Sequence, residues 1–295
     1  MDNNKKRHLT QTISSIAANG NIKGFVKGCI YTGNVKKICV PILNCYSCPG
    51  ALGACPIGSM QAVIGSMKYN FSYYVFGAIT LIGIVLGRFV CGWLCPFGFI
   101  QDLLHKIPSP KLSVPRKLNN VLKYLKYAIL VLFVFTFPLI LQDDLGMSDP
   151  YFCKYICPAG TLEGGIPLLL ANESLRNATG FLFRWKFFIL IFIIIFSIFI
   201  YRIFCRYICP LGAFYSLFNP VSLYSFKIDE NMCTKCNACT NNCKMNIKPY
   251  ETPNSPECIR CGNCISSCPN NAIKSSLLVE KHKHIKATTN VNQNN

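Results

Sequence analysis

The sequence predicts a mainly α-helical membrane protein: a polytopic bundle of three or four transmembrane helices, followed by a small C-terminal α+β domain. Two observations support the membrane part. Hydrophobic residues make up 51% of the 295 residues and charged residues only 14%, and several uncharged stretches approach the roughly 20 residues that a spanning helix needs. A third observation sets the end of the chain apart, because eight of the 19 cysteines fall between Cys233 and Cys268.

We therefore expect four regions along the chain. Residues 1–37 form a basic N-terminal segment, and residues 38–226 form the membrane domain. Residues 227–278 form the cysteine-rich C-terminal domain, and residues 279–295 form a disordered polar tail. Within the first region, Ile13–Val26 fits either an amphipathic helix on the membrane surface or a weak transmembrane span, and the sequence does not decide between them.

The membrane domain begins with an unusual uncharged stretch at residues 38–67. Its length would suffice for a span, but three prolines and four glycines interrupt it. Irregular backbone at membrane depth is stable only where protein or a cavity satisfies its polar groups. We therefore predict a bent or re-entrant segment that holds Cys45, Cys48 and Cys55.

Three further stretches predict transmembrane helices: Phe71–Gly87, Tyr127–Gln142 and Phe181–Phe204. Gln101–Lys126 between the first two is strongly basic, so the positive-inside rule predicts a cytoplasmic loop there. Residues 143–180 carry more acids than bases, so we expect them on the outer face.

One short phrase, Cys-Pro-x-Gly, occurs four times in the membrane domain. Proline after cysteine fits the first position of a helix, which places the thiol at a helix N-terminus where the dipole favours thiolate. The glycine allows a bulky ligand to approach the backbone. The alternative is that these small residues and thiols only pack a helix bundle. The copies are Cys55–Gly58, Cys95–Gly98, Cys157–Gly160 and Cys209–Gly212.

The predicted topology divides these cysteines between the two membrane faces. Four thiols of the inner face form what we call the inner set: Cys91, Cys95, Cys205 and Cys209. Four others are predicted at the outer face: Cys48, Cys55, Cys153 and Cys157. Each group has enough thiolates for one metal site, so we expect one or two iron–sulfur clusters here. Two disulfides are the alternative at the outer face, since that face is open to an oxidising compartment.

The C-terminal domain carries the pattern C-x2-C-x2-C-x3-C twice. This is the run of bacterial ferredoxins, in which the fourth cysteine of each run ligates the other of two [4Fe-4S] clusters. Zinc sites and disulfide frameworks use other spacings. The first ferredoxin set is therefore Cys233, Cys236, Cys239 and Cys268. The second ferredoxin set is Cys258, Cys261, Cys264 and Cys243.

The formal net charge of +18 could indicate nucleic-acid binding. The basic residues flank the apolar stretches, however, so the positive-inside rule explains most of them and we expect no nucleic-acid partner. The remaining charge suits an acidic electron-transfer protein. Two cysteine–proline phrases, Cys91–Pro96 and Cys205–Pro210, together with the double ferredoxin run, resemble the NapH-type membrane ferredoxins, which are related to NosR-type and CcoG-type membrane domains. The resemblance covers about residues 71–275 and implies a membrane electron carrier with a cytoplasmic ferredoxin module.

These observations predict an iron–sulfur electron-transfer protein of the cytoplasmic membrane. It would pass electrons between its cytoplasmic ferredoxin module and a membrane or extracytoplasmic redox partner, as a subunit or partner of an oxidoreductase rather than a stand-alone catalyst. The alternatives are a transmembrane thiol–disulfide relay and a membrane redox sensor or maturation factor. A quinone is a candidate partner near five interfacial residues, although anchoring by Trp and Arg is the preferred explanation for them. They are Arg88, Trp93, Gln101, Asp102 and His105.

Overall fold

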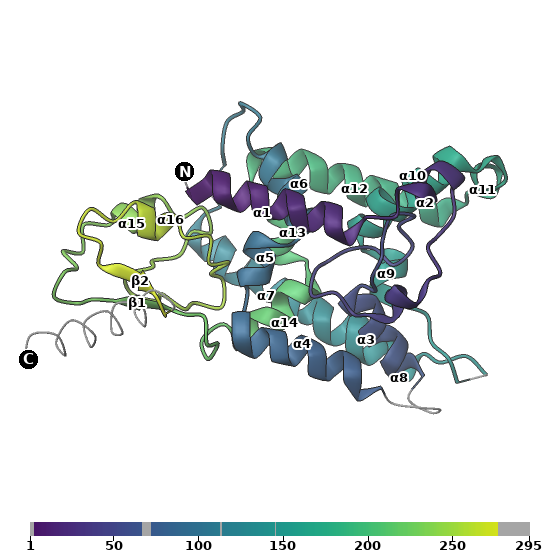
Figure 1. Cartoon of the computed structure of the whole chain (residues 1–295), viewed down its shortest axis with the longest axis horizontal. Coiled ribbons are helices and arrows are strands. Elements are labelled where there is room, and N and C mark those ends of the chain that lie inside the picture. The colour runs from purple at the N-terminus through teal and green to yellow at the C-terminus, as the bar shows by residue number, and fades with distance from the viewer. Residues whose placement is uncertain (1–2, 67–71, 113, 145, 277–295) are drawn as a thin grey trace, which may run out of the picture.

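The computed structural model describes residues 3–66, 72–112, 114–144 and 146–276. The predicted tail therefore lies outside the described residues. Helices form an elongated body, and a small domain with two short strands lies at one end of it (Figure 1). Along the body run α1 (Asn3–Ala18), α4 (Tyr73–Leu86) and α12 (Phe181–Phe199). The mainly helical architecture predicted from the composition is confirmed.

In the described part of the chain, two helical stretches are long and apolar enough to cross a bilayer, Lys117–Ile140 and Phe181–Phe199. The first consists of α7 (Arg116–Ile129), a π-helical segment η2 (Leu130–Thr136) and α8 (Phe137–Ile140). A π-helical turn shifts the hydrogen-bonding register just before Pro138, whose ring disfavours ordinary helical bonding to the preceding turn.

The predicted helix at Phe71–Gly87 is shorter than expected. Phe71 lies outside the described residues, and α4 has 14 residues, a length of about 21 Å at 1.5 Å per residue. A bilayer core is about 30 Å thick. The helix ends at Gly87, which has a φ of +55°, and the next residue, Arg88, is fully buried. The predicted total of three or four spans thus stays a prediction.

The basic stretch Gln101–Lys126 is not one loop, and that prediction was wrong at both ends. Its first residues belong to α6 (Pro96–Leu104), and its last ones belong to α7. Gln101 and Lys126 are both buried. Charge along the sequence indicated exposure, whereas the charges at these ends are paired inside the protein.

The remaining helical segments are short and connect the long helices. Before α3 (Pro56–Gly65), the chain from Ile38 to Cys55 is irregular, with one bridge between Cys39 and Ala54. Short helices that carry a cysteine are α5 (Phe89–Trp93), α9 (Tyr151–Tyr155) and α13 (Ile203–Tyr207), and Cys209 precedes the longer α14 (Pro210–Phe218). The others are α2 (Ile22–Lys27), η1 (Asn34–Lys37), η3 (Gly160–Gly165), α10 (Ile166–Ala171) and α11 (Glu173–Asn177).

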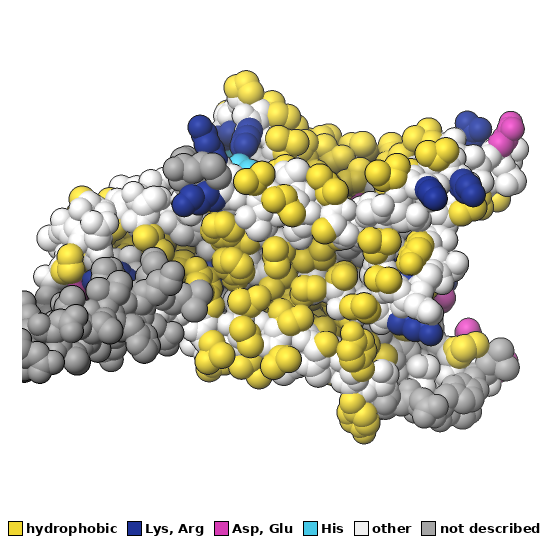
Figure 2. Space-filling model, in the orientation of Figure 1, with side chains coloured by type: hydrophobic (Ala, Val, Ile, Leu, Met, Phe, Trp, Pro, Cys, Tyr) yellow, Lys and Arg dark blue, Asp and Glu magenta, His cyan; other side chains and the backbone are white. Residues whose placement is uncertain are grey.

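Hydrophobic side chains cover the middle of the visible face of the helical body (Figure 2). Lysines and arginines gather where this body meets the small domain and near the opposite end. Such a belt suits a lipid environment, because exposed apolar patches of this extent are rare on soluble monomers. Inside the body, one hydrophobic core contains Cys55 and Cys157 as well as all four thiols of the inner set.

The C-terminal domain repeats one backbone conformation. Strands β1 (Phe226–Ile228) and β2 (Ile273–Ser275) pair antiparallel, and α15 (Ala238–Asn241) and α16 (Asn263–Ser266) lie between them in the chain. Positive φ angles recur at equivalent places of the two cysteine runs. These pairs are Lys235 and Arg260, Asn237 and Gly262, and Asn246 and Asn271. Two equal runs of sequence thus fold into two equal loops.

Candidate iron–sulfur sites

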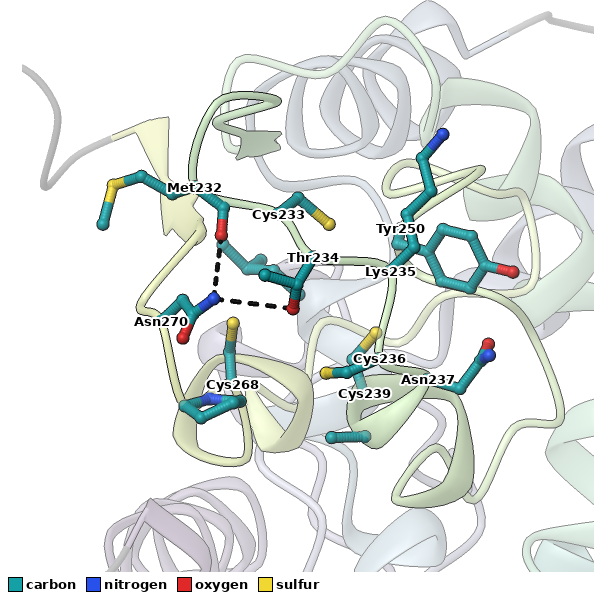
Figure 3. Close-up of a pocket in the computed structure, with 13 residues that line it drawn as sticks. Met232, Cys233, Thr234, Lys235, Cys236, Asn237, Cys239, Tyr250, Cys268 and Asn270 are labelled. Atoms are coloured by element: carbon teal, nitrogen blue, oxygen red, sulfur yellow. Dashed lines mark hydrogen bonds between the residues drawn. The ribbon is translucent and has the colours of Figure 1, made fainter.

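The first ferredoxin set lines a single cavity. Cys233, Cys236 and Cys239 come from the first run, and Cys268 comes from the end of the second. Figure 3 shows their sulfurs arranged around a common space, with Tyr250 at its edge. Asn270 closes one side by donating to the carbonyl oxygen of Met232 at 3.1 Å. The fold therefore brings together the four cysteines that the ferredoxin pattern groups.

The second ferredoxin set lines a separate cavity of the same domain. Cys243 joins Cys258, Cys261 and Cys264 there, among apolar side chains such as Ile247 and Ile259. The backbone N–H of Arg260 donates to the sulfur of Cys258 at 3.4 Å. Such N–H donors stabilise thiolate ligands and tune the potential of a cluster that they hold.

The spacing of these thiols bears on the zinc alternative. Among the described residues, no three His, Cys, Asp or Glu side chains converge closely enough to hold a single metal ion. Zinc would draw its thiolates to about 2.3 Å from one point. Cavities walled by four separated thiols favour a larger group such as a cubane.

The inner set lies in the hydrophobic core of the helical body, toward the end that meets the ferredoxin domain. Cys95 and Cys209 precede α6 and α14, and each sulfur accepts a hydrogen bond of 3.4 Å from the N–H of a glycine three residues later. All four thiols are buried, with exposures between 4% and 8%. In these two copies the cysteine sulfur caps the helix, and the proline after it takes the first helical position.

Two arginines tie the halves of the inner set together. Arg88 donates to the carbonyl oxygen of Cys205 at 3.1 Å, and Arg202 donates to that of Cys91 at 2.7 Å. Each arginine stands three residues before one cysteine pair and bonds to the other pair. The contacts between the two halves are therefore reciprocal, as in a local pseudo-twofold arrangement. A longer repeat, R-x2-C-x3-C-P-x-G, is present in the sequence and could have revealed these arginines.

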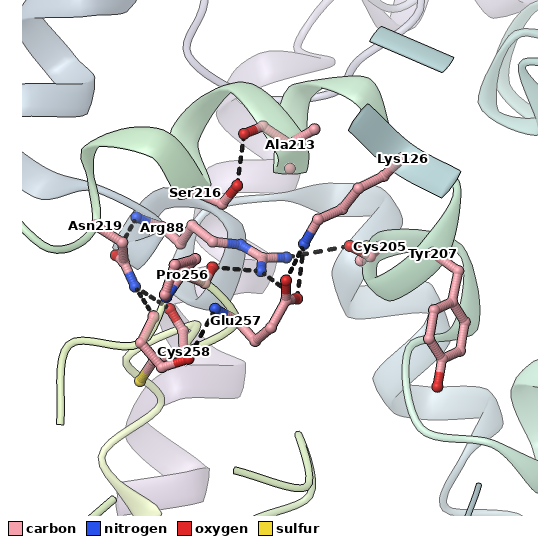
Figure 4. A network of polar contacts seen from close by, with 12 residues as sticks. Arg88, Lys126, Cys205, Tyr207, Ala213, Ser216, Asn219, Pro256, Glu257 and Cys258 are labelled. Carbon is pink, nitrogen blue, oxygen red and sulfur yellow. Dashed lines mark hydrogen bonds and ion pairs between the residues drawn. The ribbon is translucent and has the colours of Figure 1, made fainter. Parts of the chain in front are cut away.

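Each arginine belongs to a buried triad of two bases and one carboxylate. Glu257 pairs with Arg88 at 3.1 Å and with Lys126 at 2.6 Å (Figure 4). The second triad joins Asp102 to Arg202 at 2.5 Å and to Arg7 at 3.3 Å.

With every group ionised, each triad would carry one more positive than negative charge. Burial opposes ionisation of Asp102, but Arg202 and Arg7 outweigh it and lower the pKa of Asp102 to about 2. Glu257 likewise has a lowered pKa, because Arg88 and Lys126 outweigh its burial. The surplus positive charge on both sides suits an anionic group between them, and a thiolate-held cluster is such a group.

The second ferredoxin set lies against the inner set. Trp93 donates to the carbonyl oxygen of Arg260 at 3.0 Å, and Asn219 donates to that of Cys258 at 2.9 Å. Gly92 sits so close that an added Cβ would lie 2.2 Å from the carbonyl oxygen of Ile259. The loop of the inner set and the loop of the ferredoxin domain are therefore in backbone contact.

Replacing Gly92 with alanine tests this contact. We expect Gly92→Ala to lower stability by about 1–3 kcal/mol or more, because the new methyl group must displace backbone rather than a mobile side chain. Thermal unfolding of the purified protein measures the change. Gly77→Ala in α4 is the matched control, since an added Cβ there meets nothing within 4 Å. Gly77→Ala should be neutral or stabilising by up to about 1 kcal/mol. Equal effects of the two variants would contradict the contact.

The outer cavity differs from the sequence prediction in one thiol. It has a volume of about 680 Å³, and its cysteines are Cys45, Cys55, Cys153 and Cys157, which we call the outer-cavity set. Cys48, predicted in place of Cys45, is buried and donates instead to the side-chain oxygen of Asn19 at 3.4 Å.

The loop that carries Cys45 is fixed by the carboxyl group of a distant residue. The backbone N–H of Cys45 donates to a carboxyl oxygen of Glu163 at 2.7 Å. Cys45 and Cys48 are three residues apart in one bend, and the bend turns only one of them into the cavity. Nothing in the local pattern distinguishes the two.

Three thiols of the membrane sites are not activated nucleophiles. Burial raises the pKa of Cys205 to about 11 and the pKa of Cys45 and Cys153 to about 12. Burial also raises the pKa of the four thiols at helix N-termini, where we expected the dipole to favour thiolate: Cys55, Cys95, Cys157 and Cys209. Dithiols that exchange disulfides need a lowered pKa and access to solvent, so the arrangement disfavours a thiol–disulfide relay.

Comparison with known proteins agrees with this picture. A family profile described as a 4Fe-4S binding domain matches residues 71–115, 145–169 and 184–228, and these segments contain all three C-x3-C-P pairs. A second 4Fe-4S binding domain profile matches residues 253–274, where the second ferredoxin run lies. No solved structure matches the chain.

Several curated proteins are similar to the chain. An uncharacterized protein of Methanocaldococcus jannaschii, MJ0750, is 36% identical over 69% of this chain and 78% of its own length. The ferredoxin-type protein NapH of Haemophilus influenzae is 25% identical over 83% of this chain and 79% of its own. The regulatory protein NosR of Stutzerimonas stutzeri is 28% identical, over 72% of this chain and 27% of its own.

The chain belongs to the NapH- and NosR-like family of 4Fe-4S membrane proteins. The predicted resemblance is thereby confirmed, as is an iron–sulfur electron-transfer role in its general form. In this NapH- and NosR-like chain, the profile-matched segments include both repeats of the inner set.

Proposed function

We propose that this protein carries electrons through a fixed series of four iron–sulfur centres. The first and second ferredoxin sets hold two [4Fe-4S] clusters, and the inner set holds a third centre. The outer-cavity set holds a fourth. The observation that carries the proposal is the backbone contact between the second ferredoxin set and the inner set, through Gly92 and Ile259.

Exposure gives the series a direction in space. Cys236 of the first ferredoxin set is exposed, whereas Cys258 and Cys264 of the second set are buried beside the helical body. A soluble redox partner would therefore exchange electrons with the first cluster, and the second would exchange them with the inner centre. The positive-inside distribution of the chain supports a cytoplasmic position for the ferredoxin domain.

A physical connection also leads from the inner set to the outer cavity. Tyr215 is fully buried in α14, the helix that begins after Cys209. Its hydroxyl donates to the carbonyl oxygen of Pro41 at 3.0 Å, in the irregular segment that carries Cys45. The two sites are thus parts of one packed core, which shortens the transfer across a hydrocarbon layer of about 30 Å. The final partner would be extracytoplasmic or in the membrane, with a quinone as one candidate.

Iron and sulfide analysis with EPR on anaerobically purified protein tests the proposal. Two ferredoxin clusters alone would give about eight irons per chain, and clusters at both further sites would bring the total to about sixteen. A total near eight would limit the function to the ferredoxin domain. Ready labelling of the inner thiols by an alkylating reagent in the iron-loaded protein would instead favour the thiol–disulfide relay.

A pair of serine variants tests the outer centre. We expect Cys45→Ser to remove about four irons, because Cys45 lines the outer cavity, while Cys48→Ser should keep the full content. Both residues lie in the same bend, so the variants are matched in position. Iron loss from Cys48→Ser but not from Cys45→Ser would contradict this assignment and restore the set predicted from the sequence.

A further inference from the structure

A second kind of site lies at the junction of α1, α6 and the ferredoxin domain. It is a cavity of about 250 Å³, and its wall gathers basic side chains from segments far apart in the sequence. The groups that can carry positive charge are Lys5, Arg7, His8, His105, Lys106 and Lys244. None of these residues belongs to the four cysteine sets.

The described residues do not balance the positive charge of this cavity. The one carboxylate among its lining residues is Asp102, which already pairs with Arg202 and Arg7. Among the described residues, no carboxylate pairs with Lys106 or Lys244.

Two buried nitrogen atoms of the wall are also without a hydrogen-bond partner. Arg7 is 2% exposed, and its Nε has no acceptor. Nδ1 of the half-buried His105 also has no hydrogen-bond partner. Buried donors in proteins are normally satisfied, and exceptions indicate a missing ligand or water. The unbalanced charge of the described wall points to an anion with several acceptor oxygens as the ligand.

The position of the cavity indicates where such an anion comes from. Tyr201 forms part of the wall and follows the end of the spanning helix α12 by two residues. Its hydroxyl accepts from Arg7 at 3.1 Å, and the ammonium group of Lys244 lies 5.4 Å from its ring centre. In Figure 2, basic and histidine side chains gather at the boundary between the hydrophobic belt and the small domain. This is the level of lipid headgroups on the face of the ferredoxin domain.

We propose that this cavity binds a phosphate group, either that of an anionic phospholipid or a free phosphate ion. Ammonium and guanidinium groups form strong charge-assisted hydrogen bonds with phosphate oxygens. A lipid phosphate would enter from the membrane and a free ion from solvent, and both offer the same chemistry to Lys106, Lys244 and Arg7. The proposal does not depend on the iron–sulfur relay.

Binding measurements on the full holoprotein test the site. One arm counts phosphatidylglycerol molecules that the delipidated protein retains from vesicles of phosphatidylcholine and phosphatidylglycerol, by native mass spectrometry. The other arm titrates inorganic phosphate calorimetrically in lipid-free detergent. We expect the double variant Lys106→Gln, Lys244→Gln to weaken the binding seen in wild type by at least about tenfold, because each lysine contributes a charge-assisted hydrogen bond.

A second double variant is the matched control. Lys23→Gln, Lys27→Gln removes the same charge from exposed positions of α2, away from the cavity, and it should bind as wild type does. Retained phosphatidylglycerol supports the lipid source, and phosphate binding alone supports the free ion. Wild-type protein that binds neither probe, or a Lys106, Lys244 variant that binds both unchanged, would overturn the proposal. Equal iron contents of all variants show that they are folded.

Discussion

The double variant Cys205→Ser, Cys209→Ser is expected to lose about four irons and to stop electron transfer between the ferredoxin domain and the outer centre. Both thiols are buried in the inner set, and serine is a hard, poorly ionised ligand where a cluster needs soft thiolate. The two ferredoxin clusters should stay in place and remain reducible from solution. Their EPR signals and a stopped-flow assay of the outer centre measure the two effects.

The control for this experiment is Cys29→Ser. Cys29 is exposed and lines none of the cysteine cavities, so iron content and transfer should equal those of wild type. If the inner variant kept its full iron content, the third centre would be excluded. If it lost the ferredoxin clusters as well, the two sites would be one folding unit and not independent binding sites.

Asp102→Asn is expected to be the most destabilising charge change in the chain. The amide has the size of the carboxylate, but it leaves Arg202 and Arg7 buried without a counter-charge. Breaking a buried pair in this way costs about 3–5 kcal/mol, which corresponds to a melting temperature lower by on the order of 10 °C. Thermal unfolding followed by circular dichroism measures it.

Acid gives a second test of the same carboxylate. The pKa of Asp102, about 2 in the folded protein, lies below its ordinary value of 3.8. Its contribution is therefore complete above about pH 4 and is lost as the pH falls toward 2. Asp102→Asn should remove this part of the pH dependence.

The exposed pair between Asp149 and Lys154 is the control, because Asp149→Asn should cost less than about 1 kcal/mol. If Asp102→Asn lowered stability as little as Asp149→Asn does, the triad would not be important for the stability of the fold.

Much of this arrangement could be predicted from residue spacing. The ferredoxin pattern groups eight cysteines, and the structure gathers the same eight around two cavities. The inner set followed from a repeated phrase and the distribution of basic residues. Within each run or pair, a tight turn or a helix end positions cysteines that are close in sequence, and contacts between distant segments then bring the runs or pairs together.

The outer cavity and the buried charges could not be predicted in this way. The choice of Cys45 over Cys48 depends on a bend whose direction is set by distant Glu163. Lys126 and Asp102 were assigned to an exposed loop, because a charged residue indicates solvent unless its partner is known. Their partners, Glu257 and Arg202, lie more than 90 residues away in sequence. A local sequence pattern therefore cannot identify them.

The contact between Gly92 and Ile259, together with the Glu257 triad, means that the ferredoxin domain packs rigidly against the helices and does not move on a flexible linker. A tethered shuttle that swings between donor and membrane is therefore not how this molecule would operate. The proposed centres would keep fixed positions relative to one another. The step that recurs in each cycle would be the transient association of a diffusing redox carrier with the surface around Cys236. Turnover would then follow the concentration and charge of that carrier, and stiffening the link between the two domains would leave it unchanged.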